Sequence, residues 1–373
     1  MPFEQNELMA QDAMVKELLR PLAAFLTIPH ATEIVVNRPG EVFVESGPKW
    51  TRHAAPSLTL DRCWSLANAI ASYTGQRIDV QAPLLSAQLP GGQRIQIVVP
   101  PASERNTVSM TIRVADAATR TFDEYQREGF FSHYVWPRPE GLGTRCQDLT
   151  MAQRGLINYL EQNRLADFLR SAVRSRQNVV FVGDTGSGKT SLMKSACQHI
   201  PDDERLITIE DVREINLDMH PNRAHLLYSK GGQGLASVSL ADLIASAMRM
   251  KPDRVLLAEL RGAEAFDFLK LLTTGHSGSI SSFHAESCAL ALERYVFMCK
   301  EHQHAAIYDA PSLKHLIALT IDVIVHIQVE RIYDEHGEPL RKNRYVSEVH
   351  YDPIAKLDAR YGSGTLHHAG DLQ

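Results

Sequence analysis

The sequence predicts an α/β protein in which a smaller N-terminal α+β domain with a mainly antiparallel sheet precedes a C-terminal domain with a mostly parallel sheet. Up to about residue 136, short alternating strands are separated by tight turns, as in antiparallel sheets. From about residue 150, apolar runs alternate with helical segments, as in parallel sheets covered by helices. Residues 136–145 hold two prolines and two glycines without periodicity, which is typical of a linker. We therefore expect an N-terminal domain at 1–136, a linker at 137–150, a second domain at 151–350 and a flexible tail at 351–373.

Turn residues and hydrophobic periodicity place the elements of the N-terminal part. Leucines and a phenylalanine at helical spacing predict a first helix, and Gly75 is expected to end a second one. Proline- and glycine-containing turns separate the strands. The elements expected are a helix at 18–26, a hairpin of strands at 32–37 and 41–45, a helix at 59–74, and strands at 87–89, 94–99 and 108–114.

Five apolar runs supply the strands of the C-terminal part, and each is followed by a turn or a helix. A polar hairpin is expected after them, over residues 331–352. The runs are NVVFV (178–182), RLITI (205–209), RVLLA (254–258), SISSF (279–283) and DVIVHIQV (322–329).

Composition excludes several classes of protein. The chain has 373 residues, 44% of them apolar, with 44 acidic and 39 basic side chains and a net charge of -5. These values are ordinary for a globular protein and exclude a disordered tail, a coiled coil and a collagen-like fibre. A slightly acidic balance counts against a protein that depends on the phosphates of duplex DNA. Five dispersed cysteines without a CxxC pair indicate reduced thiols. We expect no signal peptide at the start of this sequence. No apolar run reaches the ~20 residues that are needed to cross a bilayer.

The strongest motif is GDTGSGKT at 183–190, which matches GxxxxGK[ST] between an apolar strand and a helix. In such a loop the backbone N–H groups and the helix N-terminus surround phosphates, and Lys189 adds a full positive charge. Thr190 is the expected ligand of Mg²⁺. A chance glycine loop is the alternative. The residues expected to bind the nucleotide are Gly183, Asp184, Thr185, Gly186, Ser187, Gly188, Lys189, Thr190 and Ser191.

Carboxylates follow two of the apolar strands. Glu259 ends the strand at 254–258, where an acid beside the phosphate loop can orient Mg²⁺-bound water or activate the attacking water. The alternative for Glu259 is a cap of the helix that begins after Gly262. Glu210, Asp211 and Glu214 follow another strand, and because clustered carboxylates repel one another without a cation, they are candidates for the outer shell of Mg²⁺. A solvated charge cluster is the alternative for these three.

Two histidines lie among small residues, His276 in TGHSGS and His284 in SFHA. A neutral imidazole can hydrogen-bond a γ-phosphate or the acid that senses it, so both are candidates for the nucleotide site. No zinc is expected, because no cysteine or third histidine stands at ligand spacing.

In their order along the chain, these four motifs resemble those of the secretion-ATPase superfamily, which drives type II secretion, type IV pili and type IV secretion. The stretches TEIVVNRPGEVFVE, LPGGQRIQIVVPP and RMKPDRVLLAELRGAEA are most similar to the hexameric ATPases of type IV secretion systems. The resemblance covers about residues 15–350. The tetracysteine zinc insert of many type II secretion motors has no counterpart here.

The resemblance implies a RecA-like ATPase domain at 151–350, a ring of six subunits, and Mg²⁺-ATP bound between the two domains. Arg94 and Arg113 match N-terminal positions that reach over the phosphates in this family. Arg249 and Arg261 flank the Glu259 strand and are expected to contact phosphate from the same or a neighbouring subunit. A surface ion pair is the alternative for each arginine. The catalytic residues expected are Lys189, Glu259, Glu214, His284, Arg94 and Arg113.

The function implied is an ATP-hydrolysing hexameric motor that powers export of conjugative DNA or effector proteins by interdomain motion. Its expected partners are inner-membrane components of a type IV secretion system, and its expected place is the cytoplasm at the inner membrane. A pilus assembly or retraction motor and a RecA-like nucleic-acid motor are the alternatives. Linker length also leaves open which neighbour's N-terminal domain covers a given site.

Overall fold

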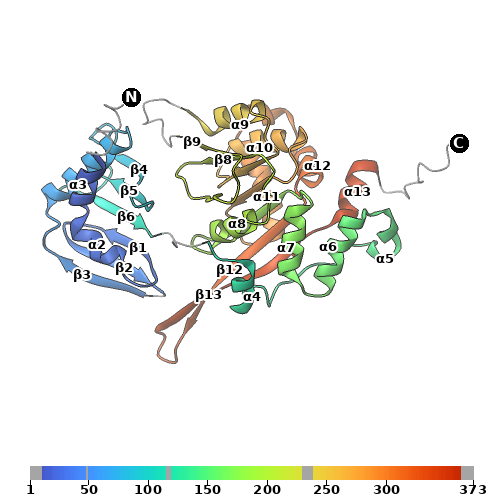
Figure 1. The fold of residues 1–373 in the computed structure, drawn as a ribbon, viewed down its shortest axis with the longest axis horizontal. Coiled ribbons are helices and arrows are strands. Elements are labelled where there is room, and N and C mark those ends of the chain that lie inside the picture. Colours follow the sequence, from blue (N-terminus) through green and yellow to red (C-terminus); the bar gives the residue numbers. More distant parts are fainter. Residues whose placement is uncertain (1–10, 48, 115–118, 229–237, 363–373) are drawn as a thin grey trace.

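The computed structural model describes residues 11–47, 49–114, 119–228 and 238–362 of the chain. Two sheets are present, an antiparallel one in the N-terminal part and a mostly parallel one in the C-terminal part (Figure 1). The predicted fold class is therefore confirmed. Among the described residues, no helix combines the length and the hydropathy that a bilayer-spanning segment requires.

The N-terminal sheet has six strands in the order β3-β2-β1-β6-β5-β4, and all of its neighbouring strands are antiparallel. In the strands other than β3, alternate residues face a core that the amphipathic helix α3 completes. The predicted hairpin and both predicted helices are present, whereas β3 was not predicted. Its alternation is weak because its residues are mostly exposed. The elements are α2 (Arg20–Leu26), β1 (Ala31–Val36), β2 (Gly40–Ser46), β3 (Lys49–Ala55), α3 (Leu60–Tyr73), β4 (Leu84–Gln88), β5 (Arg94–Val98) and β6 (Ser109–Arg113).

The C-terminal sheet has seven strands in the order β13-β12-β7-β11-β10-β8-β9. All neighbouring pairs are parallel except β12 with β13, which form the predicted hairpin. The five predicted apolar runs form β7, β8, β10, β11 and β12, and β9 was not predicted because its side chains are only partly buried. The strands are β7 (Val179–Gly183), β8 (Leu206–Glu210), β9 (Arg223–Leu227), β10 (Arg254–Leu257), β11 (Ile280–Phe283), β12 (Val323–Tyr333) and β13 (Pro339–His350).

Helices cover both faces of this sheet (Figure 1). The central strand β7 shows the layering, because Val179 and Phe181 belong to one core and Val180 and Val182 to the other. The first core is completed by α4, α6, α7 and α8, and the second by α9, α10, α11 and α12. The helices are α4 (Phe122–Arg127), α5 (Leu142–Arg145), α6 (Met151–Glu161), α7 (Leu165–Arg174), α8 (Lys189–Cys197), α9 (Leu240–Arg249), α10 (Glu264–Thr273), α11 (Cys288–Lys300), α12 (Ala310–Thr320) and α13 (Pro353–Tyr361), with 3-10 turns at Cys146–Asp148 and Gln303–Ile307.

Packing places the segment before residue 136 with the C-terminal sheet. Phe122 and Phe131 are buried in the same core as α7 and α8. Val135 donates its N–H to the Ser347 carbonyl of β13 at 2.8 Å and accepts from Val349 at 2.9 Å. The division at residue 136 was drawn from proline and glycine content, and the core contacts instead favour a boundary before Phe122.

The segment expected to be a flexible tail begins with a packed helix. Residues Pro353 and Ile354 of α13 are buried, and Asp358 accepts a hydrogen bond from Arg145 in the predicted linker. Residues 353–361 therefore differ from the expectation, because the aliphatic side chain of Ile354 joins the core beside α7. The remainder of the predicted tail, from residue 363 onward, lies outside the described residues.

Candidate active site

The phosphate-binding loop connects the buried strand β7 to helix α8, as the motif predicts. Gly183 has a φ of 151°, and a Cβ atom there would lie 2.4 Å from the Ile327 carbonyl of the adjacent strand. Gly188 has a φ of 98° and begins α8 as its N-cap residue. These glycines allow the chain to turn tightly against β12, so the N-terminus of α8 faces the loop.

Lys189 is buried inside its own loop, with 7% of its surface exposed. Its Nζ donates to the carbonyl oxygens of Gly183 at 3.0 Å and Asp184 at 2.8 Å. Burial lowers the pKa of Lys189 to about 8, although the carboxylates of Glu259 and Asp184 oppose the shift. The ammonium therefore occupies the concave side of the loop, where a phosphate would compete with these carbonyls for it.

Glu259 lies at the carboxyl end of the β10 strand and contacts two basic side chains. Its Oε2 accepts from Arg261 Nε at 2.7 Å, and its Oε1 lies 3.0 Å from His284 Nε2. Burial alone would raise the pKa of Glu259, but the hydrogen bond from His284 and the charge of Arg261 outweigh it and lower the pKa to about 2. The carboxylate is therefore ionised at neutral pH.

Glu259 does not cap helix α10, which was the alternative for this residue. The carboxylate of Glu264 accepts the backbone N–H groups of Arg261 at 2.7 Å and Gly262 at 3.0 Å. Glu264 thus satisfies this turn, and the charge of Glu259 acts on the phosphate-loop lysine.

His284 links the loop lysine to Glu259. Its Nδ1 lies 3.3 Å from Lys189 Nζ and its Nε2 lies 3.0 Å from Glu259 Oε1. Lys189 can only donate, so Nδ1 accepts and Nε2 carries the proton that Glu259 accepts. The imidazole thus joins Lys189, at the start of α8, to Glu259, which follows β10.

Acidic residues after β8 pair with basic residues from both parts of the chain. Asp211 Oδ2 accepts from Arg94 Nη2 at 2.8 Å and lies 3.3 Å from Arg261 Nη1. Glu214 accepts from Arg94 Nη1 at 2.6 Å. These carboxylates are not a solvated cluster, since the side chains of Asp211 and Glu214 are only 8% and 16% exposed. Arg94, on β5 of the N-terminal sheet, therefore contacts the C-terminal domain directly.

The remaining predicted residues near the loop have local partners. Arg113 pairs with Glu33 across the N-terminal sheet at 2.9 Å, and its charge also acts on Lys189. Glu210 is fully buried, and its Oε2 accepts the backbone N–H groups of Glu214 at 2.7 Å and Ile215 at 2.8 Å. The structure thus gives Glu210 the role of holding the turn that presents Asp211.

His276 and Arg249 lie at the opposite edge of the sheet from the loop, contrary to the prediction for this chain's own site. His276 precedes β11 and Arg249 precedes β10, whereas the phosphate loop follows β7. Because these strands are parallel, residues before a strand and residues after it occupy opposite edges. His276 lies 3.2 Å from Thr274 Oγ1, and Arg249 donates to the Ala245 carbonyl of its own helix at 3.1 Å. A contact between Arg249 and a neighbouring subunit stays a prediction.

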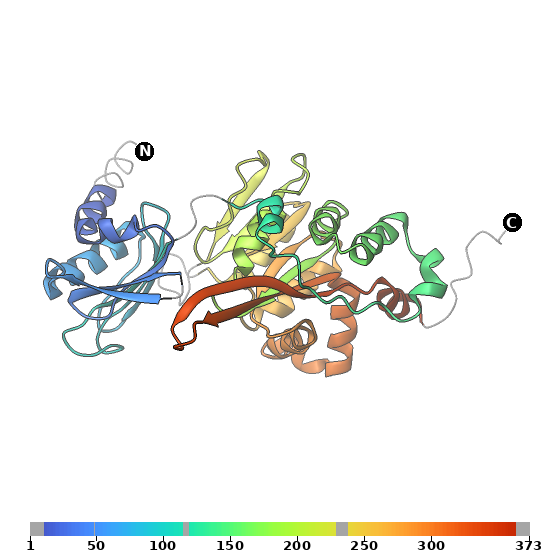
Figure 2. The ribbon, with the colours of Figure 1, turned by 90° about the horizontal axis from the view of Figure 1, so that it is seen from below.

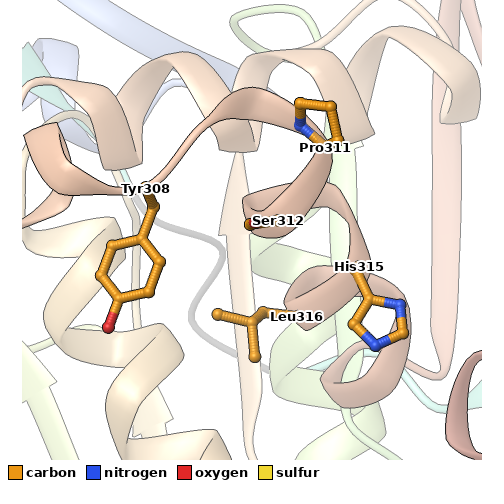
Figure 3. A pocket seen from close by; sticks show the side chains of 5 residues that line it. All are labelled: Tyr308, Pro311, Ser312, His315 and Leu316. Carbon is orange, nitrogen blue, oxygen red and sulfur yellow. The ribbon is translucent and has the colours of Figure 1, made fainter.

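A pocket of about 470 Å³ lies away from the phosphate loop, beside the start of α12 (Figure 3). It is lined by Tyr308, Pro311, Ser312, His315 and Leu316. None of these is a residue of the four motifs, and the lining offers no carboxylate, lysine or arginine. This pocket is therefore separate from the predicted nucleotide site.

One contact of the loop was missed by the sequence analysis. Arg344 of β13 donates from Nε to the Gly186 carbonyl at 2.9 Å. It stands in the stretch that the sequence identified only as a polar hairpin. No local motif signals it, because the contact depends on the antiparallel register of β12 with β13.

Comparison with known proteins identifies the family of this chain. A family model described as "Type II/IV secretion system protein" matches residues 142–355. The chain is 43% identical over 346 residues to the type IV secretion system protein VirB11 of Brucella suis, with 92% of each chain covered. It is 40% identical over 319 residues to PtlH of Bordetella pertussis, with 85% of this chain and 91% of PtlH covered.

Solved structures add to the comparison. The VirB11 ATPase of Brucella suis, crystallised with sulphate, has 41% identity and a TM-score of 0.51, over 95% of this chain and 99% of that one. The ATPase DotB of Legionella pneumophila shares the fold at 16% identity, with a TM-score of 0.55 over 89% of this chain and 80% of that one.

The fold and the matched family model define a P-loop ATPase of the type II/IV secretion class. Within that class, the chain belongs to the VirB11 family of type IV secretion ATPases.

Proposed function

We propose that this chain is a ring-forming ATPase of six subunits that powers export of DNA or effector proteins through a type IV secretion system. The observation that carries the proposal is a series of polar contacts that begins at Lys189 and ends at Arg94. Between them stand His284, Glu259, Arg261 and Asp211. A change at the loop is thereby connected to the N-terminal sheet through a continuous series of charged and hydrogen-bonding side chains. We further propose that the protein acts in the cytoplasm beside inner-membrane components of that system.

The loop residues fit a nucleotide phosphate chain. Ser187 Oγ is buried without a hydrogen-bond partner among the described residues, which suits an oxygen ligand on the loop. Lys189 would exchange its two carbonyl partners for phosphate oxygens, which form stronger charge-assisted bonds. Arg94 and Arg113 would approach the phosphates from the N-terminal sheet as the domains close.

The site also offers oxygen ligands for Mg²⁺, in the small number that this ion usually takes from a protein. Mg²⁺ is usually held by one or two protein oxygens together with substrate phosphates, so a dedicated cage is not needed. Thr190 in the first turn of α8 would hold it directly and Glu259 through water. Glu210 remains a candidate for the outer shell of the ion, because its Oε2 accepts two backbone N–H groups whereas its buried Oε1 has no hydrogen-bond partner among the described residues. When bound, the ion neutralises phosphate charge.

Glu259 would position the water that attacks the γ-phosphate. It is ionised, and its two contacts fix the carboxylate in place. After hydrolysis, loss of the γ-phosphate would return Lys189 and Arg94 to their protein partners. Exchange of ion-pair partners at a domain boundary is an ordinary source of hinge motion.

Arg94→Ala tests the link between the domains. We expect the variant to lose turnover by about tenfold or more, since an arginine that stabilises transferred phosphate contributes at least this much. Nucleotide affinity should change less, because the phosphate loop is intact. Steady-state kinetics of purified wild type and variant measure both quantities. Native mass spectrometry of the same samples should show six-fold rings with nucleotide.

Arg77→Ala is the matched control for this test. Arg77 lies in the same N-terminal part and pairs locally with Asp79 at 2.8 Å. Its loss removes the same charge without touching the C-terminal domain. Equal turnover of wild type and Arg94→Ala would contradict the proposed role of the contact series, and a strictly monomeric wild type would contradict the motor.

Nucleotide affinity should also fall as the pH rises above about 8. The pKa of Lys189 in the free loop is about 8, below the usual value of about 10.4. Bound phosphate favours the charged ammonium, so above pH 8 the lysine must take up a proton on binding. The Kd for ADP should therefore be about tenfold higher at pH 9 than at pH 7.5.

Calorimetric titrations in two buffers of different ionisation heat measure this proton uptake directly. Above about pH 7.5 the phosphates themselves are almost fully ionised and contribute little. A Kd that stays constant from pH 7.5 to 9, without proton uptake, would show that Lys189 is already charged throughout this range.

A further inference from the structure

The β12–β13 hairpin runs from the C-terminal sheet to the N-terminal sheet (Figures 1 and 2). Strand β12 pairs with β7 up to the register Ile327 with Gly183, at the start of the phosphate loop. Beyond that point, the hairpin continues past the loop to its turn near Gly337. Strand β13 therefore returns alongside the loop.

Arg344 of β13 makes two contacts with the loop. Its Nε donates to the Gly186 carbonyl at 2.9 Å. Its Cδ lies 4.0 Å from the position that a Cβ atom on Gly188 would occupy, so the side chain passes close to Gly188. Within the described part of the chain, its Nη1 and Nη2 atoms have no hydrogen-bond partner, although Arg344 is only partly exposed.

The strand that carries Arg344 is anchored to the N-terminal sheet by ion pairs. Lys342, two residues earlier and thus on the same face of β13, pairs with Glu45 of β2. The side chains of Lys342 and Glu45 are 15% and 14% exposed, so this ion pair is largely buried. Nearer the turn, Glu338 pairs with Lys49 of β3 at 3.2 Å. Arg344 is consequently held on a fixed strand rather than on a loose loop.

We propose that Arg344 is a positioning residue of the nucleotide site, acting through the Gly186 carbonyl. This inference rests on the proposed function. Bonding the carbonyl on the outer side of the loop leaves the inner side, where Lys189 and the Asp184 carbonyl lie, free to rearrange around phosphate. The guanidinium also brings a positive charge beside the loop, which favours bound anions.

The test compares Arg344→Ala and Arg344→Lys with wild type in ADP titrations and in ATPase kinetics. For Arg344→Ala we expect the Kd for ADP and the KM for ATP to rise about tenfold, which corresponds to loss of one hydrogen bond from a charged donor. The kcat should stay within about twofold, since Arg344 does not touch the reacting atoms. Arg344→Lys should recover most of the affinity, because a lysine can also donate to the carbonyl.

Arg341→Ala is the matched control. Arg341 lies on the same strand, is exposed, and makes no ion pair with the described residues. The Arg341→Ala variant loses the same charge as Arg344→Ala, and its affinity for ADP should equal that of wild type. Thermal unfolding of all three variants shows whether the hairpin remains folded.

The outcomes separate this inference from the proposed function. If wild type binds no ADP, the proposed function itself fails. If wild type binds ADP and Arg344→Ala binds it equally well, only the role of Arg344 is overturned. Equal losses in Arg344→Ala and Arg344→Lys, or an equal loss in Arg341→Ala, would also overturn it, because the effect would then not depend on donation to Gly186.

Discussion

Lys189→Ala is expected to abolish ATP turnover and to weaken ATP binding by about tenfold to a hundredfold, the range for losing hydrogen bonds from a charged donor. The loss of turnover should exceed the loss of binding, because charge on the transferred phosphate grows in the transition state. The stability of the protein should stay the same or rise. Lys189 is buried, not solvent-facing as a loop residue would suggest, and burial of its charge is unfavourable in the free protein.

Lys194→Ala provides the control for Lys189→Ala. Lys194 lies on the same helix α8 and is partly exposed. Turnover, nucleotide titration and thermal unfolding should all match wild type for this variant. If Lys189→Ala retained turnover within tenfold of wild type, the phosphate loop would not be the site of hydrolysis. A large drop in its melting temperature would show instead that the carbonyl contacts of Lys189 hold the loop together.

The phosphate loop and the strands around it could be predicted from the sequence because their signals are local. The strand residues 179–182 are apolar at every position, and the glycine pattern that follows them is typical of a phosphate-binding loop. Glu259 could be found for the same reason, since it stands two residues after the last residue of the buried strand β10. In each case a few consecutive residues contain both the structural and the chemical signal.

Placement across the sheet was less predictable, because it depends on which end of a strand a residue occupies. His276 and His284 flank the same short strand β11, and only His284 follows it on the loop side. Composition around the two histidines is similar, so the motif alone does not separate them. Once the parallel strand order is known, the direction of the chain shows which of the two histidines lies on the side of the phosphate loop.

Long-range pairs were the least predictable part of the site. Arg94 meets Asp211 and Glu214 across more than a hundred residues, and the sequence identified both groups without pairing them. Arg344 reaches Gly186 only because β13 is antiparallel to β12. Such contacts are set by tertiary packing, for which a single sequence has no local marker.

Glu259→Gln should bind ATP with nearly wild-type affinity and turn it over about a hundredfold to a thousandfold more slowly, the usual contribution of a positioned carboxylate that handles a proton. Glutamine has the same shape and can still accept from His284 Nε2, so the contact with the loop-lysine side should survive. The negative charge that faces Arg261 is lost, and with it the ability to polarise water. Slow hydrolysis with retained binding would therefore separate the two roles of the site.

Glu286→Gln is the control for this change, since Glu286 is exposed, lies two residues beyond His284 and makes no ion pair with the described residues. Single-turnover measurements on pre-bound ATP distinguish slow chemistry from slow product release. Near-normal turnover by Glu259→Gln would remove Glu259 from the reaction and leave it only as a partner of Arg261 and His284. A loss of ATP binding together with the loss of turnover would contradict a role of Glu259 in hydrolysis alone. It would mean that the charge of Glu259 is needed to hold Lys189 and His284 in the geometry that receives phosphate.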